Sequence, residues 1–321
     1  MTPSRIPLLL VVLLVAGCGG GSSNSAPSQP IAFTVNDEGW GEIWLMDESG
    51  QSRKQLTDAR PEGSESSGST SPSWSPDRKH IAYAGVGNSV VADPAFEDIY
   101  VMDADGTNSK QLTHNTVPDF SPDWSPDGKK IVFSHASVVT EAPLSALYVM
   151  DADGSHQKLL YRVNDALLVT ADWSPDGKRI AFTQVTYPNT TTVASIYVIN
   201  SDGTGAKRIA GDAAEPAWSP DGTHIAFATG RDHFGRTCVP QCQANDEIYV
   251  ADATGANPRR LTTDKAEDTS PTWSPDGTQI AFVSDRTSRE TQNEIFVVDA
   301  SGGEAKRITN NDVWDLEPDW K

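Results

Sequence analysis

Short apolar runs of strand length recur along the chain, separated by clusters of polar and turn-forming residues. One set reads Ile, then Ala or Val, then an aromatic residue, and covers residues 81–83, 131–133, 180–182, 225–227 and 280–282. A second set, with Ile or Leu before an aromatic residue and Val, covers residues 99–103, 147–151, 196–200, 248–252 and 295–299. β-Branched and aromatic runs of this length between turn residues are typical of β-strands. Beyond the first residues no segment has helical periodicity, so the pattern predicts an all-β protein.

These runs belong to a repeat marked by the tetrapeptide Trp-Ser-Pro-Asp. The tetrapeptide begins at Trp74, Trp124, Trp173, Trp218 and Trp273, and Trp320 follows Pro-Asp near the end of the sequence. Successive Trp residues are 45 to 55 residues apart. An interval holds the Trp segment, the two apolar runs and a short fourth segment, such as the one that ends at Leu112-Thr113. Four strands at this period are typical of a β-propeller blade.

The two ends of the sequence complement each other. Residues 31–33, 43–47 and 55–57 match the second, third and fourth strands of a blade without a first strand, whereas residues 318–320 match a first strand alone. The sequence therefore predicts a six-bladed propeller of four-stranded antiparallel blades. The C-terminal strand is expected to join the N-terminal blade as its innermost strand, which leaves no open joint in the ring.

The N-terminal residues have a different composition. The apolar run after Arg5 is shorter than the roughly 20 residues of a membrane-spanning helix, which indicates a secretory signal peptide over residues 1–17. Residues 15–18, Val-Ala-Gly-Cys, resemble the lipobox of bacterial lipoproteins, and the resemblance implies lipid modification of Cys18. An ordinary cleaved signal peptide is the alternative. Residues 18–30, rich in Gly and Ser, are expected to form a flexible tether before a propeller over residues 31–321.

The net negative charge of the chain argues against two classes of binding partner. The 321 residues include 44 Asp and Glu against 25 Lys and Arg, a formal net charge of −19. This excess argues against a nucleic-acid partner, which needs clustered Lys and Arg, and against electrostatic docking on anionic lipid. Membrane contact is therefore expected only through the lipid at Cys18. The protein would be extracytoplasmic and anchored to a bacterial membrane, in the periplasm or on the outer surface.

Four features of the repeat together resemble the propeller of the TolB family over residues 31–321. They are the Trp-Ser-Pro-Asp-Gly turn, the Ile-Ala-Phe run, the Ile-Tyr-Val-Met-Asp run and the Leu-Thr ending. TolB proteins also have an N-terminal α/β domain that contacts membrane partners, whereas this sequence has only the tether. The resemblance thus implies a TolB-like lipoprotein without that domain. Relatives of this propeller also serve as accessory domains of serine peptidases and as lyases of pectate-derived oligosaccharides.

Most of the conspicuous Asp residues are expected to belong to turns. Ser-Pro-Asp-Gly places Pro and Gly at turn positions that they favour, and its Asp would cap backbone N–H groups. The Asp-Ala-Asp-Gly segments at 103–106 and 151–154 would do the same. Calcium binding is the alternative, although the ligand pattern of an EF-hand is incomplete. The repeat Trp residues are expected in the core between blades.

The face opposite the tight turns holds the candidate binding residues, because variable loops on a rigid frame commonly carry function. Residues five and three positions before each repeat Trp lead into the innermost strand on that face. Their acidic members are Asp119, Glu215, Asp268, Asp315 and Glu317. We expect an acidic ring at the channel mouth that attracts a basic peptide or a divalent cation such as calcium. Solvated loop carboxylates without a ligand are the alternative.

The longest loop on this face, residues 229–246, is a second candidate. It carries a basic and aromatic set that stands out on an acidic protein: Arg231, His233, Phe234 and Arg236. It also holds Cys238 and Cys242, which outside the cytoplasm are expected to form a local disulfide. Metal binding is the weaker reading, because a structural zinc site needs four ligands.

Catalytic signatures are scarce in the sequence. It has no Gly-x-Ser-x-Gly elbow, and its six His fall at differing repeat positions. We therefore expect a monomeric, non-enzymatic module that binds a protein or peptide of the cell envelope and needs no cofactor. One alternative is carbohydrate or cell-wall binding through Trp40 and Trp314, which are expected in loops outside the repeat pattern. The other is a lyase or hydrolase whose channel site combines dispersed His, Gln and Arg.

Overall fold

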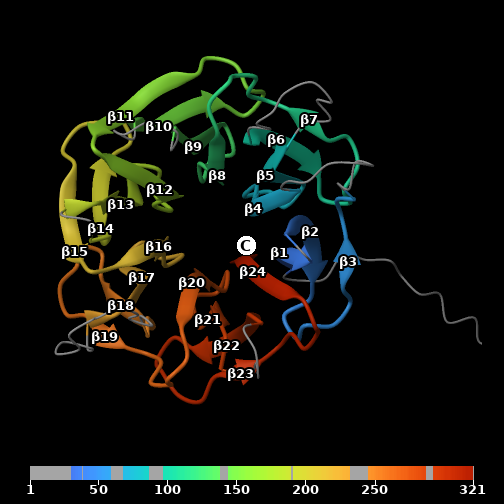
Figure 1. Ribbon diagram of the computed structural model, residues 1–321, viewed down its shortest axis with the longest axis vertical. Helices are drawn as coiled ribbons and strands as arrows, with labels where there is room; N and C mark the ends of the chain where they lie inside the picture. Colours follow the sequence, from blue (N-terminus) through green and yellow to red (C-terminus); the bar gives the residue numbers. More distant parts are fainter. Residues whose placement is uncertain are drawn as a thin grey trace, which may run out of the picture.

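The computed structural model describes residues 30–37, 39–58, 68–86, 97–137, 144–188, 191–231, 245–286 and 292–320. The 24 strands in these ranges form six four-stranded sheets around a central axis (Figure 1). The prediction of a six-bladed all-β propeller is therefore confirmed.

Each blade is an antiparallel meander that runs outward from the axis. The innermost strands of blades 1 to 6 are β24 (Trp314–Trp320), β4 (Ser69–Trp74), β8 (Asp119–Trp124), β12 (Ala166–Trp173), β16 (Ala214–Trp218) and β20 (Asp268–Trp273). The second strands, in the same order, are β1 (Ile31–Asp37), β5 (His80–Val86), β9 (Lys130–Ser137), β13 (Arg179–Thr186), β17 (His224–Thr229) and β21 (Gln279–Ser284). The third strands are β2 (Trp40–Met46), β6 (Glu97–Asp103), β10 (Leu144–Asp151), β14 (Val193–Asn200), β18 (Glu247–Asp252) and β22 (Glu294–Asp299). The outermost strands are β3 (Lys54–Gln55), β7 (Lys110–Gln111), β11 (Lys158–Asn164), β15 (Lys207–Gly211), β19 (Arg259–Arg260) and β23 (Lys306–Arg307).

The ring closes as the two ends of the sequence predict. β24 pairs antiparallel with β1, with Trp320 opposite Ile31 and Asp315 opposite Val35. Figure 1 shows β24, in red, beside β1, in blue, next to the axis. Strands from both ends of the sequence therefore share blade 1, so unfolding that blade would open the ring.

Apolar side chains between adjacent blades form the core. Trp74 of blade 2, for example, packs with Ile43 and Leu45 of blade 1. The six repeat Trp residues are between 1% and 8% exposed: Trp74, Trp124, Trp173, Trp218, Trp273 and Trp320. The expectation that they belong to the core is confirmed, and each contributes a large apolar area to a joint between blades.

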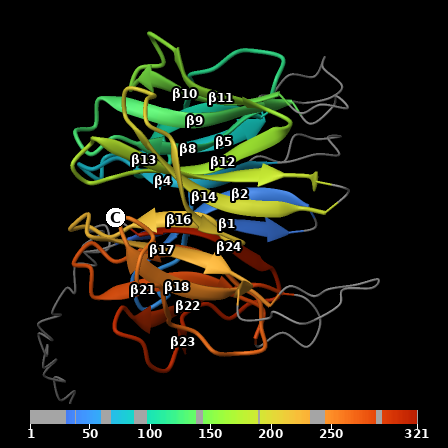
Figure 2. The same cartoon turned by 90° about the vertical axis from the view of Figure 1, so that its left-hand side faces the viewer.

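The meander gives the propeller two different faces, seen edge-on in Figure 2. We call the face with the connections between first and second and between third and fourth strands the turn face, and the opposite one the loop face. On the turn face, Gly128 N–H donates to Ser125 O at 2.8 Å, and Gly128 has a φ of +68°. Asp127 Oδ1 accepts hydrogen bonds from Ser125 Oγ at 2.7 Å and from Lys129 N at 3.1 Å. The predicted turn and its Asp cap are thus both present.

The N-terminal expectations fall on residues 1–29, which lie outside the described residues. Cys18 and most of the expected tether are among them. Within the described part of the chain, no helix combines the length and the hydropathy needed to cross a membrane.

Candidate functional site

Every innermost strand carries a bulge on the loop-face side of its Trp. The register against the second strand shifts between Thr70 and Ser73 in β4, and likewise in the other five blades. The residues three positions before the Trp have φ values of 49–57° although none is Gly: Ser71, Ser121, Thr170, Glu215, Ser270 and Glu317. Such left-handed backbone costs about 1–3 kcal/mol per residue. All six residues line the central channel, so the bulge is what brings them to the axis.

The channel consists of two adjoining cavities. Its loop-face part has a volume of about 380 Å³ and is lined by the six bulge residues and by Pro in five blades. Its turn-face part has a volume of about 260 Å³ and is lined by the six repeat Trp and five turn Pro residues. Asp172, Ala217, Thr272 and Asp319 border both parts. A ligand that enters from the loop face would meet polar walls first and aromatic walls deeper in.

Glu215 and Glu317 are the two carboxylates among the bulge residues, and each contacts the next blade. Glu317 Oε2 accepts hydrogen bonds from Ser71 N at 2.7 Å and from Thr34 Oγ1 at 2.9 Å, and its Oε1 accepts one from Ser71 Oγ at 3.1 Å. Glu215 Oε2 accepts one from Ser270 N at 2.6 Å. No described residue donates a hydrogen bond to Glu215 Oε1. Glu215 therefore has one oxygen with capacity for a ligand, whereas Glu317 is largely engaged in the fold.

The surroundings of Glu215 disfavour its charged form. Burial raises its pKa to about 7 from the usual 4.5, and repulsion by Asp246, Glu317 and Glu267 adds to the rise. The hydrogen bond from Ser270 N opposes it. A carboxyl group that is poised near neutral pH in a channel wall would gain from a cation that binds beside it.

The expected ring of five carboxylates is wrong in one respect, because only two of the five, Glu215 and Glu317, line the channel. Asp119, Asp268 and Asp315 are fully buried inside their blades. Each pairs with a residue of the second strand, opposite His135, Ser284 and Val35, before the bulge turns the backbone toward the axis. Their side chains therefore face the interior of the blade.

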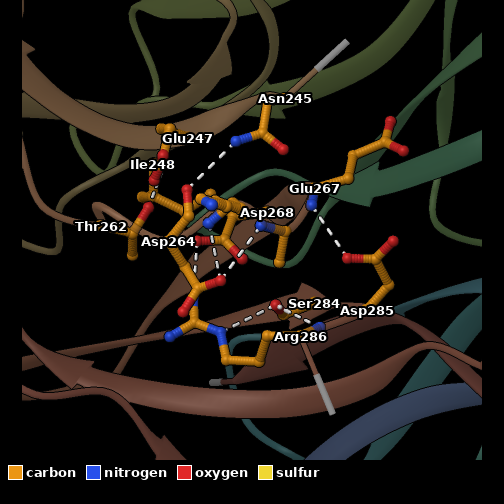
Figure 3. A network of polar contacts seen from close by, with 12 residues as sticks. Asn245, Glu247, Ile248, Thr262, Asp264, Glu267, Asp268, Ser284, Asp285 and Arg286 are labelled. Atoms are coloured by element: carbon orange, nitrogen blue, oxygen red, sulfur yellow. Dashed lines mark hydrogen bonds and ion pairs between the residues drawn. The ribbon is translucent and has the colours of Figure 1, made fainter. Parts of the chain in front are cut away.

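Each of these three Asp residues is held by a cationic or ionisable partner. Asp119 Oδ1 lies 2.6 Å from His135 Nδ1, Asp315 Oδ2 lies 3.3 Å from Arg53 Nη2, and Asp268 Oδ2 lies 2.6 Å from Arg286 Nη2. Figure 3 shows the contacts of Arg286 with Asp268 and Ser284, and a separate hydrogen bond from Glu267 N to Asp285 Oδ1. Burial raises the pKa of Asp315 to about 6 in spite of Arg53. These three Asp residues therefore stabilise the interior of their blades and do not reach the channel.

The pKa shifts separate the two faces of the propeller. Hydrogen bonds from neighbouring hydroxyl and backbone groups lower the pKa of the Asp residues in the turns, as for Asp127 and for Asp221, where it falls to about 2. At the loop face, burial raises the pKa of Glu97 and Glu267, as it does for Glu215. The turn carboxylates thus stabilise their own turns. The carboxylates around the channel lack partners among the described residues that offset the cost of burying their charge.

The expected binding loop lies mostly outside the described residues. Of its four candidates the structure describes Arg231 alone, and His233, Phe234 and Arg236 belong to residues 232–244, as do Cys238 and Cys242. The expected disulfide and the role of this loop stay predictions. The guanidinium carbon of Arg231 lies 5.4 Å from the ring centre of Tyr249 and 5.9 Å from that of Phe227.

The expectation that Trp40 and Trp314 lie in loops is wrong, because they are the first residues of β2 and β24. They lie at one end of blade 1 but on different sides of it. Trp314 is opposite Asn36 and Trp40 is opposite Asp37, and neighbouring residues of a strand point to opposite faces. Trp314 is 44% exposed. The two rings therefore do not form one stacking surface for a sugar.

Within the described ranges, no group of three or more His, Cys, Asp or Glu is arranged to hold a metal ion.

Sequence reasoning missed Glu97, Asp246 and Glu267, which add negative charge around the channel. Glu267 directly precedes the first residue of β20, one position before those singled out in the sequence. It also missed that the turn Pro residues line the far end of the channel.

Comparisons with known proteins agree with the repeat and the fold. A family model described as the TolB beta propeller domain matches residues 136–321. Among curated proteins, an uncharacterized protein of Agrobacterium fabrum is 31% identical over 105 residues and covers 32% of this chain and 31% of its own length. A protein TolB homolog of Chlorobium chlorochromatii is 33% identical over 105 residues, with 23% of this chain and 24% of that protein covered. The chain thus matches about a third or less of the length of these relatives.

Two solved structures show the range of proteins that share the fold. TolB from Acinetobacter baumannii has a TM-score of 0.69 at 22% identity, with 91% of this chain and 66% of that chain covered. An oligogalacturonate lyase in complex with manganese has a TM-score of 0.51 at 16% identity, with 89% and 74% covered. At these identities the likeness shows the fold alone.

Proposed function

The chain belongs to the TolB β-propeller family, and from this premise we propose that it is a non-catalytic binding module. It takes a cationic segment of a protein partner into the loop-face end of its channel. We also propose that it works outside the cytoplasmic membrane of a bacterium as a monomer tethered through Cys18, on the evidence of residues 1–30 of the sequence.

One observation carries the binding proposal. Glu215 lies in the channel wall with a raised pKa and with Oε1 free of hydrogen bonds from the described residues, and Glu317 lies in the same wall. A Lys or Arg side chain beside Glu215 would offset both the desolvation of this carboxyl and the repulsion from its acidic neighbours. A divalent cation such as calcium would compete for the same oxygens.

The first test measures binding of a fluorescein-labelled peptide with alternating Arg and Gly by fluorescence anisotropy. Glu215→Gln keeps an acceptor for Ser270 N and removes the charge, so we expect a dissociation constant about tenfold higher, equivalent to about 1.4 kcal/mol. Glu304→Gln is the matched control, because Glu304 is exposed on the turn face and should leave the affinity unchanged. Equal affinities for the wild type and Glu215→Gln would contradict the proposal. Competition by millimolar calcium in the wild type, lost in Glu215→Gln, would show that the peptide and a divalent cation share the oxygens of Glu215.

The affinity of an N-acetylated, unlabelled peptide of the same Arg-Gly sequence, measured by isothermal titration calorimetry, is expected to rise with pH through about pH 7. Glu215 is neutral below its pKa of about 7 and charged above it, whereas this peptide keeps a constant charge over the range. We expect an increase of severalfold between about pH 6 and pH 8, and a flat profile for Glu215→Gln. The contribution of Glu215 to the free energy of unfolding changes in the opposite direction, because folding raises its pKa, so circular dichroism at each pH must verify the fold. A profile that falls with pH would contradict the role of Glu215.

A further inference from the structure

Arg231 follows β17 at the loop face with its guanidinium held by two aromatic rings. Its guanidinium carbon lies 5.9 Å from the ring centre of Phe227 on β17 and 5.4 Å from that of Tyr249 on β18. Phe227 and Tyr249 stack on each other with their centres 6.1 Å apart. The stacked pair gives the guanidinium a fixed platform, so little rotamer freedom remains to be lost when an anion binds.

Blade 6 contains the same arrangement with an anion in place. Arg286 lies four residues after Phe282, as Arg231 lies four residues after Phe227. Its guanidinium carbon is 5.2 Å from Phe282 and 4.8 Å from Phe296. Its Nη2 lies 2.6 Å from Asp268 Oδ2, and its Nε donates to Ser284 Oγ at 2.9 Å (Figure 3). In blade 6 the stacked guanidinium is therefore neutralised from within the chain.

Blade 5 lacks both of these partners. Ala213 stands five residues before Trp218, at the position that Asp268 occupies before Trp273. Thr229 stands at the position of Ser284, but its hydroxyl donates to the Asp212 carbonyl. Within the described ranges no carboxylate forms an ion pair with Arg231. The carboxylate of Asp246 lies close to Gly230. Asp246 is itself engaged in an interaction, so it is not a free carboxylate.

We propose that Arg231, which is partly exposed at the loop face, binds a carboxylate of the partner segment, as Arg286 binds Asp268 within the chain. This inference rests on the proposed function and adds a second charge to the ligand, so that the segment carries a cation for Glu215 and a carboxylate for Arg231. The planar guanidinium presents paired N–H donors that match the two oxygens of a carboxylate. The acidic surroundings would weaken the binding of an isolated anion, so that it needs millimolar concentration, and would favour a segment that bears both charges.

The first experiment measures the reaction of individual Arg side chains with phenylglyoxal by peptide mapping and mass spectrometry. We expect Arg231 to react at least about tenfold faster than Arg286, whose guanidinium is held in an ion pair by Asp268. Millimolar N-acetylglutamate should slow the reaction of Arg231, and N-acetylglutaminamide, which carries no carboxylate, should not. Ala213→Asp supplies the missing carboxylate and should slow Arg231 to about the rate of Arg286. Equal rates for the two Arg residues in the wild type, or equal protection by both compounds, would overturn the inference.

The second experiment compares an Arg-Gly peptide with a free C-terminal carboxylate and its C-terminal amide. The wild type should bind the acid about tenfold more tightly than the amide, and Arg231→Gln should bind both equally. A third peptide carries an internal Glu and a C-terminal amide. If it binds as tightly as the acid, the ligand of Arg231 is a side-chain carboxylate and not the C-terminus. In either case Arg231 is the residue that binds the carboxylate.

The two proposals fail in distinguishable ways. If Glu215→Gln weakens the acid and the amide alike while the wild type does not distinguish them, the Arg231 inference is overturned and the proposed function stands. If no cationic peptide binds but N-acetylglutamate protects Arg231, the proposed function fails and the carboxylate site stands. Arg231→Gln keeps the test decisive if Ala213→Asp does not fold.

Discussion

Replacing Trp320 by Ala is expected to lower the free energy of unfolding by about 4 kcal/mol, within the range for large-to-small changes at buried aromatic positions. Trp320 is 2% exposed and belongs to the cluster that holds Ile31 and Phe33 of blade 1 with Ile295 and Val297 of blade 6. The substitution leaves a cavity at the joint where the ring closes. Few contacts elsewhere can compensate, since this joint links the first and last segments of the described chain.

Trp314→Ala is the matched control on the same strand. Trp314 is 44% exposed, so its loss should change the free energy of unfolding by less than about 0.5 kcal/mol. Urea unfolding followed by circular dichroism would compare the two variants without depending on the Trp signal that they remove. Similar midpoints for Trp320→Ala and the wild type would show that the packing of Trp320 between blades 1 and 6 contributes little to stability.

The fold could be predicted because its signals are local and repeated. The Ser125–Gly128 turn, the apolar run at residues 131–133 and the spacing from Trp124 to Trp173 each carry information within a single blade. Six copies of a weak signal are specific when they agree. Closure was predictable for the same reason, because residues 31–57 and Trp320 are complementary fragments of a unit that the rest of the chain shows complete.

The candidate site was only partly predictable, because its geometry depends on contacts distant in sequence. Asp315 and Arg53 are 262 residues apart, and nothing near Asp315 in the sequence shows that it is buried with a cation. The bulge decides the outcome: it directs Glu215 and Glu317 to the channel and leaves Asp119 and Asp268 inside their blades. A non-Gly residue in left-handed backbone before Pro runs against local preference, so sequence rules do not predict it.

Comparing the blades with one another recovers some of this lost information. Asp268 and Arg286 form an ion pair in blade 6. At the equivalent positions of blade 5 the Arg is kept as Arg231, but Ala213 replaces the Asp. The blades can thus be compared position by position. Where one blade has a residue without the partner that the equivalent residue has in another blade, the fold alone does not explain that residue. Glu215 and Arg231 both lie in blade 5, and this blade carries the strongest functional expectations.

Gly50→Ala is expected to destabilise the protein by more than about 3 kcal/mol, because two penalties add at one residue. Gly50 has a φ of +79° in the turn between β2 and β3, a conformation that costs an L side chain about 1–2 kcal/mol. A Cβ at this position would also lie 1.7 Å from the Ile308 carbonyl oxygen of blade 6. Since that neighbour is backbone, blades 6 and 1 would have to separate to accommodate the methyl group.

Gly302→Ala separates the two penalties, because Gly302 occupies the equivalent turn of blade 6. It has a φ of +94°, but the nearest atom to its Cβ would be Arg259 Nη1 at 3.5 Å, an ordinary contact. We expect Gly302→Ala to cost about 1 kcal/mol, the backbone penalty alone. Urea unfolding of both variants would measure the difference, which is the energy of opening the closing joint. If the two variants unfold at the same urea concentration, the joint between blades 6 and 1 is free to yield, and ring closure does not depend on close backbone contact there.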